Sequence, residues 1–393
     1  MTPVDMDSPR RRQAMNHYIK VLSELLSISL NNNSFLSDFL PLAMESPALA
    51  EALIAYSSGH MSYTDPSYTT VSLTARSKAL KELSMTVSRP TTDSAVIETA
   101  LSACLILLTS EVCLGSHQSW YNHLVGAKHL IACARSHKCG STVRGAQALS
   151  LTSEGRWILR NFAYHDIIGS VTLGTQCLLN PDYLRDITDE FDTYLGVATQ
   201  LLSFVAEITC LSFDTMNLLM KSKNSRTHLN IENDIKAWNC PVGASSTLEA
   251  VAYAYRGAAL ILLYRKMRVY LEAHNDAWLG YNISFETLEG NIQEVVANGL
   301  DHIKTVPEND VSESPLLFPL FILGGEVIYQ EQMNLVLRRL EGSYGKRRFR
   351  NISRALEVLE ELWISRQVQS VLGGKRADWE DILRSTEEPL LLT

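Results

Sequence analysis

Two histidines and two cysteines lie close together at spacings that could hold a metal ion. His129, Cys133 and His137 follow one another at steps of four, which places them on one helical face, and Cys139 could reach over from the following loop. Imidazole nitrogen and thiolate sulfur in that number would suit zinc. The alternative is that Cys133 is a small buried apolar residue among core-forming neighbours. This second interpretation is favoured, and no metal site is assigned.

A second group of candidate ligands is acidic. Asp186, Asp189, Glu190 and Asp192 lie close together after Pro181. Carboxylates could hold the metal-diphosphate site of an all-helical synthase, but the Asp-Asp-x-x-Asp pattern of such sites is missing from the sequence. A solvated acidic face is therefore the favoured interpretation.

Other enzyme motifs are incomplete or absent in this sequence. Gly140 to Gly145 has the spacing of a phosphate-binding loop, but Ala146 and Gln147 follow where a lysine and a hydroxyl ligand are needed. The sequence has no G-x-S-x-G, no H-E-x-x-H and no G-x-G-x-x-G after a strand. Because no nucleophile, base and metal constellation emerges, an enzyme is the least favoured class, and no catalytic or cofactor-binding residue is assigned.

Two short basic runs are candidates for nuclear import or phosphate contact. They are Arg10, Arg11 and Arg12 near the start, and Lys346, Arg347 and Arg348 after two glycines. Such runs are more often solvated surface features. The net charge of −8 at pH 7 argues against the broad basic surface that neutralising several phosphates requires.

The composition is that of an ordinary globular protein, with 46% hydrophobic and 20% charged residues. No stretch approaches the roughly 20 uninterrupted apolar residues of a membrane helix, which argues against a membrane role. The beginning of the chain shows no secretory signal, so we expect an intracellular protein. Its seven cysteines are scattered and odd in number, which favours reduced thiols over disulfides.

The chain is expected to be organised around Leu101 to Ala134, which predicts two helices joined at Gly115. In the first helix apolar residues recur at steps of three and four and most other positions are apolar too, so burial on nearly all sides is expected. Gly115 can take the left-handed conformation that closes a helix. Gly126, in the second helix, would let another backbone come close.

Other helix boundaries carry local signals of their own. Ser46-Pro47 opens a helix, because proline suits the first helical turn, and Ser246 with Glu249 forms a capping box before a long helix. The stretch from Ser136 to Ser153 is expected to be a loop.

The last third of the chain carries a further set of packing signals. Pro319 would start or kink a helix, and Gly324 with Gly325 would allow tight packing. No alternating strand pattern persists beyond a few residues. The predicted fold is therefore all-α, one large domain of packed antiparallel helices.

Several of these segments resemble the fungal-specific transcription factor regulatory domain. After the long apolar helix and a short polar break, the resemblance lies in Trp120, His123, Leu124, Gly126, Ala127, Leu130 and Ile131. Matching segments elsewhere are HYIKVLSE, the helix GRWILRNFAYHDIIGSVTLG with Asp166 where the family tends to carry an acid, AYRGAALILLYR (254–265), PLLFPLFILGGE (315–326), RALEVLEELWISRQ (354–367) and DWEDIL (378–383). The ends of these matches predict one regulatory domain over residues 15–384, with polar tails at 1–14 and 385–393.

The resemblance implies a nuclear transcription regulator that acts on a metabolic or secondary-metabolite gene set. The implied partners are proteins of the transcription machinery, while a homodimer and a small-molecule inducer are left open. The family usually also carries a six-cysteine binuclear zinc cluster, but here the first cysteine is Cys104 and no Cys-x-x-Cys occurs. We therefore expect contact with DNA to be indirect, and zinc only with an upstream six-cysteine module.

An alternative interpretation predicts the same all-α fold but a function that does not involve DNA. The buried, aromatic-rich helical core could enclose a cavity. In that case the chain is a ligand-sensing or partner-binding modulator that does not bind DNA.

Overall fold

The computed structural model describes residues 8–88, 93–115, 120–138, 141–188, 191–211, 228–273, 284–373, 376–386 and 388–393. Helices make up most of this described chain, and its only sheet is a two-stranded hairpin, so the all-α prediction is confirmed. The chain divides into two compact units. Unit 1 comprises Met1–Asp166, Leu178–Tyr194 and Tyr344–Asn351, and unit 2 comprises Ile167–Cys177, Leu195–Ser343 and Ile352–Thr393.

Unit 1 is built on the predicted helical hairpin. Its elements in chain order are α1 (Pro9–His17), a π-helical turn (Tyr18–Leu22), α2 (Ser23–Leu26), α3 (Ser34–Ser37), α4 (Phe39–Glu45), α5 (Pro47–Met61), a 3-10 turn (Pro66–Tyr68), α6 (Thr69–Val87), α7 (Ser94–Leu114), α8 (Trp120–Cys133), β1 (Arg135–Lys138), β2 (Ser141–Arg144), α9 (Ala146–Leu149), the first part of α10 (Ser153–Leu173) and a 3-10 turn (Pro181–Asp186). Helices α5, α6 and α8 all pack against α7.

Helix α7 is long and apolar enough to cross a membrane by those two criteria alone. Within the structure, however, 83% of its most apolar window is buried. Its apolar character is therefore explained by its place in the core of unit 1, as the sequence predicted.

Most local signals act where they were predicted. Ser46 Oγ accepts a hydrogen bond from the Leu49 amide at the start of α5, and Gly115 ends α7 with a φ of 75°. The capping residue predicted for α14, Ser246, is wrong by one position. The side-chain oxygen that caps this helix belongs to Ser245, whose Oγ accepts a hydrogen bond from the Leu248 amide at 3.3 Å.

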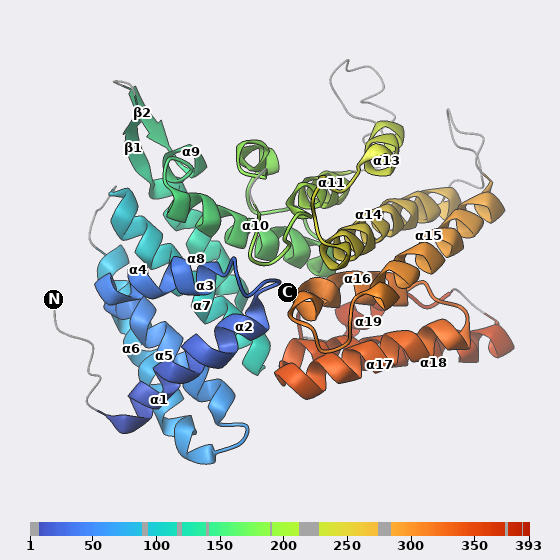
Figure 1. The fold of residues 1–393 in the computed structure, drawn as a ribbon. Helices are drawn as coiled ribbons and strands as arrows, with labels where there is room; N and C mark the ends of the chain where they lie inside the picture. Colours follow the sequence, from blue (N-terminus) through green and yellow to red (C-terminus); the bar gives the residue numbers. More distant parts are fainter. Residues whose placement is uncertain are drawn as a thin grey trace. The chain divides into compact units, whose positions relative to one another are not determined.

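Two predictions about the local backbone of unit 1 are wrong. The stretch after Ser136 was expected to be a loop, but β1 and β2 pair there as an antiparallel hairpin that projects from the helices (Figure 1). A Cβ atom built on Gly126 would meet nothing within 4 Å, so this glycine does not serve close backbone packing.

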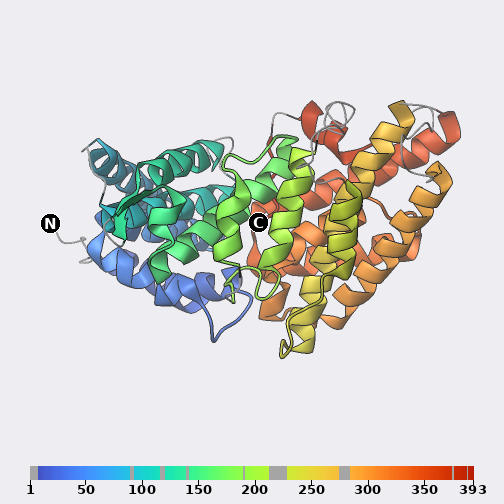
Figure 2. The ribbon, with the colours of Figure 1, turned by 90° about the horizontal axis from the view of Figure 1, so that it is seen from above.

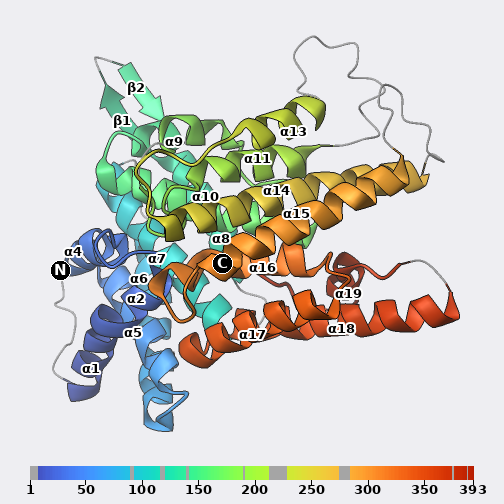
Figure 3. The same cartoon turned by 45° about the vertical axis from the view of Figure 1, so that its right-hand side comes forward.

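Unit 2 contains the last turns of α10 and the remaining described helices. These are α11 (Thr199–Cys210), α13 (His228–Ala237), α14 (Ser246–Ala273), α15 (Phe285–Thr305), a 3-10 turn (Val311–Leu316), α16 (Leu317–Gly324), α17 (Gln330–Arg347), α18 (Arg350–Leu372) and α19 (Trp379–Ser385); the last turn of α17 and the first of α18 are assigned to unit 1. Helix α15 returns alongside α14 in all three views (Figures 1, 2 and 3).

Helix α16 ends in the tight packing that its glycines predicted. Pro319 lies in the first turn of this helix, as expected. A Cβ atom on Gly324 would lie 3.0 Å from Val336 Cγ1, and one on Gly325 would lie 2.9 Å from Trp379 Cδ1. Side chains larger than hydrogen would therefore separate α16 from its neighbours at both positions.

The end of the chain is packed into unit 2. Leu390, Leu391 and Leu392 are buried, and Thr172 Oγ1 donates a hydrogen bond to the Leu390 carbonyl at 2.6 Å. Part of the expected tail 385–393 thus lies in a core, while the boundaries at 14 and 384 stay predictions.

Candidate functional site

Three of the family-like segments meet around one buried carboxylate in unit 2. Glu326, directly after α16, is fully buried, and its Oε1 lies 2.6 Å from Arg265 Nη1 and 2.8 Å from Arg268 Nη2 on α14. Its Oε2 lies 3.0 Å from Arg376 Nη2. We call Glu326 and these three arginines the Glu326 cluster.

The Glu326 cluster keeps its central carboxylate ionised. Burial alone would raise the pKa of Glu326, but the hydrogen bond from Arg268 and the charges of Arg265, Arg268 and Arg376 outweigh it. The pKa of Glu326 is therefore held well below its ordinary value. A fully buried carboxylate is tolerated here because both oxygens are bonded to cations.

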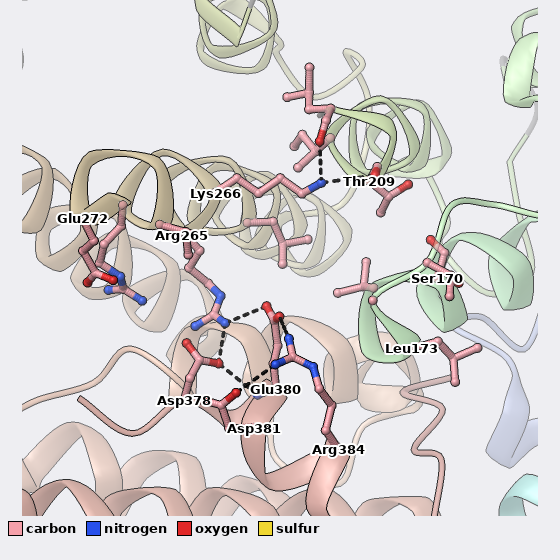
Figure 4. Close-up of a pocket in the computed structure, with 18 of the residues that line it drawn as sticks. Ser170, Leu173, Thr209, Arg265, Lys266, Glu272, Asp378, Glu380, Asp381 and Arg384 are labelled. Atoms are coloured by element: carbon pink, nitrogen blue, oxygen red, sulfur yellow. Dashed lines mark hydrogen bonds and ion pairs between the residues drawn. The ribbon is translucent and has the colours of Figure 1, made fainter. Parts of the chain in front are cut away.

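Arg265 also joins the cluster to the DWEDIL segment. Its Nη2 lies 2.7 Å from Asp378 Oδ1 and 3.0 Å from Glu380 Oε1, and these bonds are drawn in Figure 4. Its guanidinium carbon lies 4.6 Å from the centroid of the Trp379 ring. The segments AYRGAALILLYR, PLLFPLFILGGE and DWEDIL are thus neighbours in space, although they are far apart in the sequence.

Side chains of α18 complete the support by bonding the free carbonyls at the end of α16. Trp363 Nε1 donates to the Gly324 carbonyl at 3.0 Å, and Arg366 Nη1 donates to the Gly325 carbonyl at 2.6 Å. The last carbonyls of a helix have no partner within it, so these bonds fix the position of the Gly-Glu ending. Trp363 and Trp379 are thus buried packing residues of unit 2.

A cavity of about 510 Å³ adjoins the Glu326 cluster within unit 2. Its walls come from the end of α10, the end of α11, the C-terminal half of α14, and α19 with the residues directly before it (Figure 4). Each of the four lining arginines has a carboxylate partner, the fourth being Arg384, which lies 2.9 Å from Glu380 and 2.8 Å from Asp381. A volume of this size suits a small organic ligand.

Lys266 differs from the other cations that line this cavity. Its Nζ donates to the carbonyls of Thr209 at 3.2 Å and Leu211 at 3.1 Å, and in the described part of the chain it has no carboxylate within bonding distance. Burial lowers the pKa of Lys266, and the charge of Glu380 offsets this only in part.

A smaller hollow of about 200 Å³ lies elsewhere in unit 2. There the rings of Tyr253 and His302 stack with centroids 5.0 Å apart, and the Arg256 guanidinium lies 4.6 Å from the Tyr253 centroid. Its charged and aromatic groups largely contact one another, so the larger cavity is the better candidate site.

Neither Glu326 nor Lys266 was predicted as a site residue from the sequence. A usable signal was present, because Arg265, Lys266 and Arg268 lie in a helix whose neighbouring residues are apolar over several turns. Not all of these cations can reach solvent, and a cation that stays inside must find an anion or acceptor. The sequence could not show which acceptors these would be.

The first basic run, Arg10 to Arg12, contains one buried arginine between two exposed ones. Arg11 is buried, with its Nη2 2.5 Å from Glu51 Oε1, whereas Arg10 and Arg12 are exposed. A charge paired inside unit 1 cannot present itself to an import receptor or to phosphate. Arg11 is therefore a structural residue.

The second basic run, Lys346 to Arg348, also has a buried residue between two exposed ones. Arg347 is 2% exposed and its Nε donates to the Leu25 carbonyl at 3.4 Å, while Lys346 and Arg348 are exposed. Arg348 has a φ of 55°, in the left-handed region, where the chain turns from α17 into α18. Here too only the outer residues of the run face solvent.

The metal candidates are not brought together by the described chain. Cys133 is exposed, so the expectation that it is buried is wrong. His129 and His137 are exposed as well, and Cys139 lies outside the described residues. Among described residues, no group of three or more His, Cys, Asp or Glu could hold a metal ion.

The acidic residues after Pro181 divide between surface and core. Asp186 is exposed, Asp189 and Glu190 lie outside the described residues, and Asp192 is buried with its Oδ2 3.1 Å from Arg160 Nε. The prediction of a solvated acidic face is therefore wrong for Asp192, which neutralises a buried arginine in unit 1.

Asp166, at the position where the resemblance expected an acid, holds a turn in unit 1. Its carboxylate oxygens accept from the amides of Leu178 at 2.8 Å and Leu179 at 3.1 Å. Burial raises the pKa of Asp166 to about 6, and the two amide hydrogen bonds act against that rise. These contacts give Asp166 a structural role.

Comparison with known proteins adds an independent finding. The family model described as "Fungal specific transcription factor domain" matches residues 13–393. This chain is also similar to the transcriptional activator protein UGA3 of Saccharomyces cerevisiae, with 28% identity over 181 residues that cover 40% of this chain and 33% of the activator. The match thus spans about a third of that relative. No solved structure matches the chain.

Proposed function

Because the chain belongs to the fungal-specific transcription factor domain family, we propose that it controls transcription in the nucleus through protein partners. The observation that carries this proposal is the length of the family match, residues 13–393, which takes in the described parts of both compact units almost completely. A relative named as a transcriptional activator supports it. The contacts around Glu326 support it further, because they join three of the segments that resemble the family.

DNA contact is proposed to come from another module, on a partner or elsewhere in the same protein. The net charge of −8 disfavours a phosphate-binding surface, and the sequence offers no Cys-x-x-Cys for a zinc cluster. An enzyme is not proposed, since the family consists of regulators and no catalytic group of residues is recognised.

A tethered reporter assay tests the regulatory role. The full chain is fused to a foreign DNA-binding module, and transcription is compared with that module alone and with a fusion to an unrelated helical protein of similar size. Activation or repression by several-fold is expected. Transcription equal to both controls, at matched fusion levels, would count decisively against regulation.

The same cells test the proposed nuclear location. The exposed cations of the two basic runs are replaced in pairs, Arg10→Ala with Arg12→Ala and Lys346→Ala with Arg348→Ala, in a fluorescent fusion. If either run directs import, its pair shifts the fusion to the cytoplasm, whereas Arg185→Ala, which removes another exposed arginine, leaves it nuclear. A fusion excluded from the nucleus in its unaltered form would contradict the proposal.

A metabolic or secondary-metabolite gene set is the proposed target. Messenger RNA profiles of the source organism with and without this chain would identify it. Changes confined to genes outside metabolism would contradict this part of the proposal.

A second candidate function is a ligand-sensing modulator. The observation that favours it is the 510 Å³ cavity in unit 2, which is lined by the three arginines of the Glu326 cluster and by apolar residues. A thermal-shift screen of metabolites on the purified chain would detect a ligand as an increase in Tm. The two functions are compatible, since a ligand could modulate a regulator.

A further inference from the structure

We infer that the cavity in unit 2 binds a small molecule that carries one oxyanion, a carboxylate or a phosphate, on an apolar body, and that Lys266 contacts the oxyanion. This inference rests on the ligand-sensing function proposed above and names the chemistry of its ligand. Arg265, Asp378 and Trp379 act as positioning residues that hold the wall opposite Lys266.

The hydrogen bonds of Lys266 supply the first step. A lysine ammonium has three donors, and those of Lys266 are used twice, by the carbonyls of Thr209 and Leu211. Its charge has no carboxylate partner among described residues, unlike the charge of every lining arginine. One donor and a positive charge without a carboxylate partner among these residues therefore remain in the cavity wall. Figure 4 shows the Lys266 side chain with its two bonds.

The carboxylates around the cavity favour an anionic ligand over a cationic one. Asp378, Glu380 and Asp381 share two arginines, Arg265 and Arg384, so each of these carboxylates already has a cationic partner. Glu272, the fourth lining acid, is exposed near the C-terminal end of α14. It lies six residues beyond Lys266, about 9 Å along the helix. A ligand anion would therefore bind at the Lys266 end.

The nearby hydroxyl groups cannot take over the role of Lys266. Ser170 Oγ already donates to the Ile167 carbonyl at 2.7 Å, and Thr209 Oγ1 donates to the Ala206 carbonyl at 2.9 Å. A hydroxyl has one hydrogen to donate, so both present only acceptor capacity to the cavity. Thr175 also lines the cavity, but its neutral hydroxyl brings no positive charge, so Lys266 remains the charged donor for an oxyanion.

The remaining wall favours an apolar body on the ligand. It is formed by aliphatic side chains that come from three helices of unit 2, namely Val171, Leu173, Ile208, Leu211, Leu262 and Val269. Burying an apolar chain against them is favourable because it removes apolar surface from water. An anionic head beside Lys266 and an apolar tail along these residues would satisfy both kinds of wall.

A matched series of probes tests this ligand class on the purified full chain. Hexanoate and hexyl phosphate carry the two oxyanions, while hexylammonium and hexan-1-ol carry the same tail with a cationic or neutral head. Binding is measured by isothermal titration calorimetry. We expect at least one anion to bind about tenfold more tightly than either control probe. The better of the two anions identifies the head group as carboxylate or phosphate.

Variants then locate the anion. Lys266→Met is expected to weaken anion binding about tenfold or more and to leave hexan-1-ol unchanged, while Lys266→Arg retains most of the affinity because it keeps the charge. Lys81→Met, an exposed lysine of α6, is the control and should bind like the unaltered chain. The inference is overturned if neither anion binds at ~10 mM, if hexylammonium binds as well, or if Lys266→Met binds both anions normally.

A measurement on the unaltered side chain guards against misfolding of the variant. The lysines are labelled by reductive ¹³C-methylation, and the Lys266 signal is assigned by its loss in Lys266→Arg. Saturating anion is expected to raise the titration midpoint of Lys266, because an opposite charge favours the ammonium form. An unchanged midpoint at saturation would also overturn the inference.

The reporter assay separates this inference from the proposed function. If the tethered chain leaves transcription unchanged while anions bind at Lys266, the regulatory role fails and the ligand site stands. If the chain regulates transcription but no anion binds, the ligand site fails and the regulatory role stands.

Discussion

Glu51 in unit 1 and Glu326 in unit 2 are both buried glutamates, but the surroundings of each are different. Among the residues that the structure describes, Glu51 is bridged to a single cation, Arg11, and its Oε2 has no hydrogen-bond partner. Glu326 is bridged to three arginines through both oxygens. The first arrangement ties α1 to α5. The second ties three segments together beside a cavity, where fixed side-chain positions are what a binding site requires.

The largest effect is expected from breaking the three-cation arrangement. Glu326→Ala would leave Arg265 and Arg268 buried with fewer anions, and the free energy of unfolding should fall by about 5 kcal/mol. Urea denaturation followed by circular dichroism measures it. Glu331→Ala, an exposed acid of α17, is the control and should change stability by less than about 0.5 kcal/mol. A loss below ~2 kcal/mol for Glu326→Ala would mean that the Glu326 cluster does not contribute more stability than an ordinary buried ion pair.

A smaller effect is expected in unit 1. Glu51→Ala leaves only Arg11 without its carboxylate, so the free energy of unfolding should fall by about 3 kcal/mol. Replacing both partners, Arg11→Met with Glu51→Leu, should restore stability to within about 1 kcal/mol of the unaltered chain. The comparison would be wrong if Glu51→Ala cost as much as Glu326→Ala in the same denaturation experiment.

Mild acid should affect His165 in unit 1 and the Glu326 cluster in unit 2 differently. Burial lowers the pKa of His165 in unit 1 to about 3, below its ordinary 6.5, so between these values the unfolded chain binds a proton that the folded chain does not. Stability is then present above pH 6.5 and falls as the pH drops, by about 2 kcal/mol between pH 6.5 and 5 from this group. Glu326 has a lowered pKa and stays ionised over this range, so its cluster adds no acid sensitivity.

Unfolding curves at pH 7, 6 and 5 test this difference. The free energy of unfolding of His165→Gln, which cannot gain a proton, should depend less on pH, with a slope that is smaller by the uptake of about one proton. His137→Gln, at an exposed histidine of the hairpin, should keep the full pH dependence. An identical slope in the His165→Gln variant would show that this histidine is not the acid-sensitive group.

The smallest effect on stability is expected at Lys266. Lys266→Met removes a partly buried charge that has no carboxylate partner in the described chain, and it also removes the donor to two carbonyls. These changes oppose each other, so the free energy of unfolding should stay within about 1 kcal/mol. A thermal melt checks this, and a loss of ~3 kcal/mol or more would make Lys266 a structural residue instead.

Much of the fold was predictable because its signals are local. The periodicity of α7, the left-handed Gly115 and the proline at the start of α5 each act within a few residues of themselves. The resemblance to the family, confirmed by the match to residues 13–393, depended on the same strongly patterned helices.

The errors arose where the outcome depends on residues far away in the chain. Gly126 and Cys133 lie on α8, and whether their side of that helix is covered is decided by other helices. The hairpin of β1 and β2 is too short for its alternation to be distinguished from a loop. Asp192 looked solvated because its arginine partner lies 32 positions away.

The candidate site was almost invisible for the same reason. The arginines of α14 could be recognised as cations in an apolar helix, but their partners come from residues 326 and 376–380. A pocket is a property of packed surfaces, and neither composition nor spacing encodes it. Only the segments that form its walls could be recognised, through their resemblance to the family.

The sharing of Glu326 by three arginines has an evolutionary consequence. A change at position 326 leaves all three cations without their common partner, so it is costly unless positions 265, 268 and 376 change too. The pair of Arg11 and Glu51 can be replaced through only two changes. Across homologous sequences, the four positions around Glu326 should therefore be retained or lost as a group, while positions 11 and 51 should drift as a pair.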